Sequence, residues 1–140
     1  MSRPLGRAIP WISGATYVFV VPHSIEDLAH GIAGRFGLTT MEAALGLGLV
    51  FGLQALLTAL AANWRLAALA LALLGTFWFA GALFDHGPSL FDPRWRDGPT
   101  SKLLVLGVLA SDGTLALASL GLAAQWRRWQ HLGHPKPSDN

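Results

Sequence analysis

Two groups of histidine and carboxylate side chains carry the clearest chemical potential in this sequence. They are His23, Glu26, Asp27 and His30 after the first apolar run, and Asp85 and His86 after a later one. His23, Asp27 and His30 are spaced by four and three residues, which places them on one face of a helix. With His86, they form a ligand set that zinc or iron accepts. The same groups could relay protons, hold a quinone or headgroup by hydrogen bonds, contact a partner protein, or simply face water at an interface.

A further acidic residue, Asp112, lies about ten residues into the last apolar stretch. At about 1.5 Å rise per residue this is roughly 15 Å deep. A carboxylate near the middle of a bilayer is costly and rarely faces lipid, so we expect it to face other helices. Ser111, Thr114 and Gln54 are the expected partners. Proton transfer or ligand binding is one interpretation, and a structural hydrogen bond between helices is the other.

Four apolar segments position these residues and occupy most of the 140-residue chain. The composition is 52% hydrophobic and 13% charged, whereas soluble domains carry about 25% charged residues. About 20 apolar residues suffice to span a bilayer. The sequence therefore predicts an all-α integral membrane four-helix bundle in residues 1–129, with helices at about 9–33, 40–62, 65–84 and 101–126. Residues 130–140 are expected to form a polar, disordered tail.

The first helix has the least regular sequence of the four. Pro10 fits its first turn, Pro22 predicts a kink, and Gly34 and Gly37 are expected to end it. Its alternative is a shorter helix, with residues 23–33 forming a separate helix along the membrane surface.

The other helices have clearer boundary signals. Thr39 followed by Glu42 fits a capping box at the start of the second helix. Asn63 and Trp64 form a short connection, which predicts an antiparallel helical hairpin. Residues 85–100 are rich in Gly, Pro and Asp and are expected to form a loop.

Charge indicates the orientation of the bundle. Basic residues near the helix ends favour one side by six to four, so both termini are expected in the cytoplasm and both histidine groups on the opposite side. We expect a multi-pass protein located in a bacterial inner membrane. The net charge of +2 gives no support for nucleic-acid binding, and the absence of cysteine excludes thiolate ligands and disulfides.

Residues 53–86, LQALLTALAANWRLAALALALLGTFWFAGALFDH, resemble the second and third helices of the DoxX-like membrane proteins. In that family the second helix carries a polar residue, the hairpin an Arg, and the third helix ends in His. Gln54, Arg65 and His86 stand at those places. The resemblance implies a four-helix membrane fold and a link to membrane redox chemistry, with quinone as a ligand.

The sequence thus predicts a small membrane subunit associated with a respiratory or other electron-transfer complex. It would contribute helix packing to neighbouring membrane subunits and contact lipid or quinone. The alternative is an autonomous membrane enzyme or a metal- or haem-binding protein that uses the histidine and aspartate residues. On that alternative, Asp112 and Asp27 are the candidate catalytic residues, and the ligand-binding candidates are His23, Glu26, His30, Asp85, His86 and Gln54. Candidate cofactors are a quinone, a haem or a divalent metal.

Overall fold

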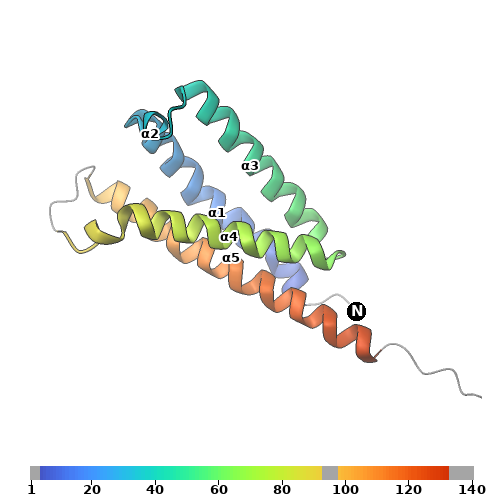
Figure 1. Cartoon of the computed structure of the whole chain (residues 1–140). Coiled ribbons are helices and arrows are strands. Elements are labelled where there is room, and N and C mark those ends of the chain that lie inside the picture. Colours follow the sequence, from blue (N-terminus) through green and yellow to red (C-terminus); the bar gives the residue numbers. More distant parts are fainter. Residues whose placement is uncertain (1–3, 93–97, 133–140) are drawn as a thin grey trace, which may run out of the picture.

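The computed structural model describes residues 4–92 and 98–132, with side chains described as far as Trp126. Within these ranges the chain is helical and has no strand. The elements are α1 (Pro4–Ala29), α2 (Ile32–Arg35), α3 (Thr40–Ala61), α4 (Arg65–His86), the 3₁₀ turn η1 (Gly87–Ser89) and α5 (Gly98–Leu132). In Figure 1 the long helices α1, α3, α4 and α5 extend between the same two ends of the molecule, with α2 and the end of α4 at one of them.

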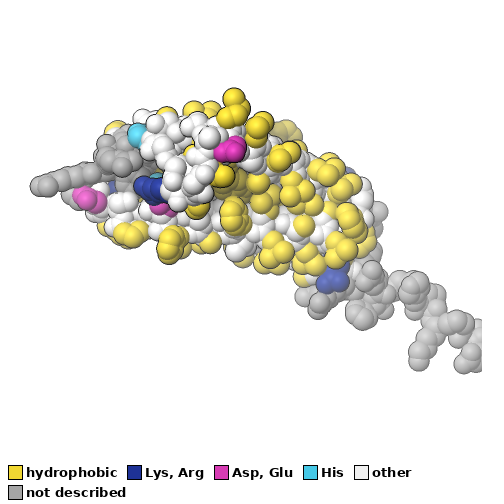
Figure 2. Space-filling model, turned by 45° about the horizontal axis from the view of Figure 1, so that its top comes forward, with side chains coloured by type: hydrophobic (Ala, Val, Ile, Leu, Met, Phe, Trp, Pro, Cys, Tyr) yellow, Lys and Arg dark blue, Asp and Glu magenta, His cyan; other side chains and the backbone are white. Residues whose placement is uncertain are grey.

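Three of these helices indicate an integral membrane protein. The segments Thr40–Ala61, Arg65–Ser89 and Gly98–Trp126 are each long and apolar enough to cross a bilayer. Figure 2 shows apolar side chains over most of the visible face between the two ends. The fourth long helix, α1, is more polar and is not one of the three.

The start of α1 differs from the sequence expectation. The helix begins at Pro4 and not near Ile9, and both Pro10 and Pro22 lie inside it. Proline suits the first helical position, because an N–H there has no intrahelical acceptor and its absence loses no hydrogen bond. The assignment of Pro10 to the first turn was therefore wrong, since Pro4 already occupies that place.

The end of α1 also differs. The helix stops at Ala29, and Gly31 follows with φ of 78°, a left-handed conformation that favours glycine. The single turn α2 comes next, and Gly37, with φ of 68°, follows it. The expected continuous helix to residue 33 was wrong because Gly31 breaks it, and Gly34 lies inside α2.

The remaining helices follow their local signals. The capping box at α3 is confirmed, because Thr39 Oγ1 accepts from the Glu42 N–H at 3.2 Å and the Thr39 N–H donates to Glu42 Oε2 at 2.8 Å. Helix α4 extends to His86, two residues past the expected end, and α5 is longer at both ends than 101–126. Residues 93–97 of the expected loop and 133–140 of the expected tail lie outside the described residues.

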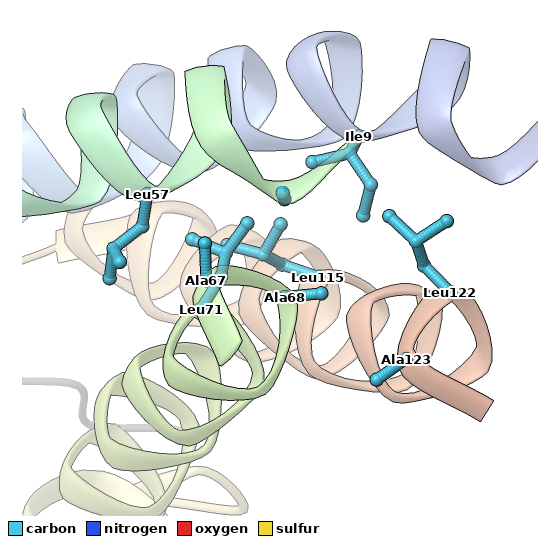
Figure 3. Close-up of a cluster of buried hydrophobic side chains, with 9 residues drawn as sticks. Ile9, Leu57, Ala67, Ala68, Leu71, Leu115, Leu122 and Ala123 are labelled. Carbon is cyan, nitrogen blue, oxygen red and sulfur yellow. The ribbon is translucent and has the colours of Figure 1, made fainter. Parts of the chain in front are cut away.

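Two apolar clusters form the core. The larger one joins all four long helices near the end that holds the start of α1, and Figure 3 shows Ile9, Leu57, Leu71 and Leu115 pointing into it. The smaller cluster contains Val20, Ala82 and Val108 and lies nearer to α2. Helices α4 and α5 have the most extensive packing, α1 packs mainly on α5, and α3 packs on α4 and α1.

Candidate functional site

Side chains from two helices converge at the end of the bundle that carries α2 and η1. His23 and Asp27 come from α1, and His86 comes from the last turn of α4. One ligand atom from each residue lies within 4.8 Å of the others. The His23 and His86 rings meet edge to face, with centroids 4.9 Å apart. His23 is buried, and the other two are half-buried. These three residues are hereafter the mouth cluster.

The two ring nitrogens of His23 each face a carboxylate. Nε2 lies 3.5 Å from Asp27 Oδ2, and Nδ1 lies 3.7 Å from Glu26 Oε2. His23 Nδ1 and Glu26 Oε2 are both buried and have no hydrogen-bond partner. A small rotation would bring this donor and acceptor within the usual hydrogen-bond distance of about 3 Å. Glu26 is therefore placed to orient the His23 ring.

The His86 ring also has a carboxylate beside it. Asp85 Oδ2 lies 3.5 Å from His86 Nε2, and Asp85 Oδ1 accepts a hydrogen bond from Arg35 Nη1 at 3.2 Å. Arg35 was not among the residues singled out from the sequence, although the expected topology placed it on the same side as Asp85. The Arg35–Asp85 pair is exposed, so it contributes little stability. It does link α2 to the end of α4.

His30 does not belong to the mouth cluster. Its helical spacing from His23 and Asp27 suggested a shared face, but α1 ends one residue before it. His30 is exposed and is not one of the three residues whose ligand atoms converge.

The mouth cluster lies beyond the apolar part of α1, which ends at Val21. Burial raises the pKa of the Asp27 carboxyl, and the neighbouring His23 and His86 rings oppose this shift. Two imidazoles and one carboxylate make a donor set that zinc and iron both use. A haem held between the two histidines does not fit, because rings in edge contact at 4.9 Å leave no space for a macrocycle.

A separate set of polar side chains joins α1 to α3 in the bundle interior. The Gln54 amide donates to Thr16 Oγ1 at 2.6 Å and to Ser13 Oγ at 3.3 Å. The Thr58 hydroxyl lies 2.8 Å from Ser13 Oγ and 2.7 Å from the backbone carbonyl oxygen of Gln54. Ser13, Thr16, Gln54 and Thr58 are hereafter the α1–α3 network. The amide of Gln54 is thus engaged with α1, and its expected bond to Asp112 is not formed.

Asp112 has no exposed surface, and neither of its carboxyl oxygens has a hydrogen-bond partner among the described residues. The other two expected partners bond within α5. The Ser111 hydroxyl donates to the Gly107 carbonyl at 2.7 Å, and the Thr114 hydroxyl donates to the Ala110 carbonyl at 2.7 Å. The expectation that Ser111, Thr114 or Gln54 would pair with Asp112 was therefore wrong.

No family model, curated protein or solved structure matches this chain. The resemblance of residues 53–86 to DoxX-like proteins stays a prediction. We therefore infer the function of this chain from the chemistry of the residues described above.

Proposed function

We propose that this chain is a multi-pass membrane protein that binds one divalent transition-metal ion through His23, Asp27 and His86. The observation that carries the proposal is the convergence of three ligand atoms, from two helices, within 4.8 Å. In the topology we propose, α1, α3, α4 and α5 each cross the bilayer and both termini are cytoplasmic. The metal then lies on the extracytoplasmic side.

The spacing of the ligand atoms suits a metal after small adjustments. Zinc binds nitrogen and oxygen ligands at about 2.0–2.2 Å, so ligand atoms in a tetrahedral shell are about 3.4 Å apart. Rotation of the side chains about their own χ angles closes the difference from 4.8 Å. Three protein ligands leave the fourth position to water or an exchangeable molecule, which is the arrangement of catalytic zinc sites.

Glu26 strengthens this proposal. A metal ion on His23 Nε2 fixes the ring hydrogen on Nδ1, and such histidines usually donate that N–H to a carboxylate. Glu26 Oε2 lies 3.7 Å from Nδ1, and both atoms are buried without a partner. Metal binding would give each of them the partner that it otherwise lacks. This accounts for a half-buried glutamate beside a buried histidine.

The other functions expected from the sequence do not require the convergence of three ligand atoms. A proton relay or a headgroup site requires histidine and carboxylate, but not three ligand atoms converging on one point. The role beside a membrane redox complex, the quinone contact and the bacterial inner membrane stay predictions from the sequence.

The test is metal binding by the purified full-length chain in detergent, carrying an affinity tag without histidine. After treatment with a chelator, Zn²⁺ is titrated by calorimetry and the bound metal is counted by mass spectrometry. We expect one ion per chain, and a loss of affinity of about 100-fold or more in His23→Ala and His86→Ala.

The matched control is His30→Ala, which removes a nearby exposed histidine and is expected to bind like the wild type. Equal affinity of His86→Ala and the wild type would overturn the proposal. So would an equal loss in His30→Ala, because binding would then not depend on the mouth cluster. A metal-free protein that co-purifies with a stoichiometric membrane partner would favour the redox-subunit function instead.

A further inference from the structure

The bundle has a polar layer between its two apolar clusters, and Asp112 belongs to it. Ile9, Leu71 and Leu115 belong to the larger cluster, whereas Val20, Ala82 and Val108 form the smaller one. On α1, α4 and α5 the buried positions between these members are Ser13, Thr16, Ala72, Gly75 and Asp112. A Cβ added to Gly75 would lie 3.0 Å from the Asp112 carbonyl oxygen, so α4 and α5 nearly touch at this level.

The donors of the α1–α3 network all have acceptors without Asp112. The Thr58 hydroxyl has one hydrogen, which it donates to the backbone carbonyl of Gln54 at 2.7 Å. The Ser13 hydroxyl therefore supplies the hydrogen of the 2.8 Å bond between Ser13 and Thr58. The Gln54 amide donates to Ser13 and Thr16, and Thr16 donates to the Ser13 carbonyl at 2.9 Å. Each hydroxyl and amide hydrogen therefore has an acceptor, and the network does not require the carboxyl group.

Among the residues that the structure describes, no charged group pairs with Asp112. Tyr17 is the one titratable group in the central part of α1 or α4, and its hydroxyl donates to the Phe51 carbonyl at 2.7 Å. The other titratable or charged residues of α1, α4 and α5 whose side chains are described lie toward the helix ends. They are Arg7, His23, Glu26, Asp27, Arg65, Asp85, His86 and Lys102.

This carboxyl group could exist in four states. An unpaired carboxylate in a low-dielectric interior is very unfavourable. A bound metal cation would need a shell of several oxygen ligands, and the hydroxyls of the α1–α3 network already bond within that network. A structural hydrogen bond between helices has no second partner in the described residues. A proton is the one cation that a single carboxyl group holds without help.

We propose that Asp112 is a proton-binding site inside the membrane, occupied at neutral pH and in exchange with solvent. On release, the O–H bond breaks, its electron pair stays on the carboxylate, and the proton passes to water admitted by a transient opening of the bundle. Ionisable residues buried in membrane helices commonly serve such proton-transfer functions. The site involves none of the residues of the mouth cluster and is tested without metal.

The experiment is infrared spectroscopy of the full-length protein in lipid nanodiscs at neutral pH, with and without ¹³C-labelled aspartate carboxyl groups. We expect the C=O stretching band of a protonated carboxylic acid, shifted by the label and shifted again after transfer to D₂O. The band should be lost in Asp112→Asn. It should persist in Asp92→Asn, which changes an exposed aspartate near η1.

The absence of a label-sensitive band in the wild type would overturn the proposal, because Asp112 would then be ionised. A band that never shifts in D₂O would overturn the exchange with solvent. Asp27→Asn removes the half-buried aspartate of the mouth cluster, and loss of the band in this variant would assign the proton to Asp27. If Asp112→Asn does not fold, the labelled wild type and Asp27→Asn still test the proposal. A label-sensitive band that persists in Asp27→Asn would then belong to Asp112, since the remaining described aspartates are exposed.

Discussion

Replacing Gly75 by alanine tests the close contact between α4 and the backbone of α5. A Cβ at this position would lie 3.0 Å from both the Ala116 nitrogen and the Asp112 carbonyl oxygen. Ordinary contacts of carbon are about 3.5–4.0 Å, so the added methyl is short of room by about 0.5–1 Å. Both neighbours are backbone atoms of α5, which no side-chain rotation can move. The helices must separate, and overpacking of this kind costs about 1–3 kcal/mol.

Gly81→Ala in the same helix is the matched control, because nothing lies within 4 Å of its added Cβ. Both substitutions gain about 0.5–1 kcal/mol from the lower backbone entropy of alanine, so this gain cancels in the comparison. We expect Gly75→Ala to have a free energy of unfolding about 1–3 kcal/mol lower than that of Gly81→Ala, measured by reversible denaturation in mixed micelles. Equal stability of the two variants would refute the close α4–α5 contact.

Two further substitutions test the polar groups. Glu26→Ala should weaken Zn²⁺ binding by about 10–100-fold in calorimetry, because it removes the carboxylate that orients His23. Unchanged affinity would mean that Glu26 has no part in the site. Gln54→Leu should lower the free energy of unfolding by about 0.6–2 kcal/mol, since it removes the amide bonds from α3 to α1. Thr114→Val, whose hydroxyl bonds only within α5, is the control, and an equal loss there would contradict the interhelical role.

Features set by a few neighbouring residues were predictable from the sequence. Thr39 and Glu42 form the expected capping box because that motif depends on residues three positions apart. The all-helical architecture likewise follows from long apolar segments, since helices satisfy their own backbone hydrogen bonds in an apolar medium. The break after α1 was harder to place. Gly31, Gly34 and Gly37 all stand there, and the sequence does not show which of them ends α1; both Gly31 and Gly37 have positive φ.

Features that depend on the rotation of a helix about its axis were not predictable. The spacing along the chain gave the depth of Asp112 and Gln54, but not the direction in which each side chain points. Gln54 faces α1, where it bonds to Thr16, and Asp112 has no hydrogen-bond partner. The prediction for His30 failed for a related reason. Its place on the same helical face as His23 required α1 to continue past residue 30, but α1 ends at Ala29.

The two proposed sites are separated by the smaller apolar cluster. From His86 to the level of Gly75 and Asp112 is about 16 Å along α4, and Val20, Ala82 and Val108 lie in between. These apolar side chains offer no hydrogen-bonding group, so we expect that exchange of a proton between Asp112 and the mouth needs a transient movement of a helix. Helix α1 has a suitable weak point, since Pro22 lies between Val20 and His23 and removes one backbone hydrogen bond there. The proline thus lies where bending would open the apolar layer between the two sites.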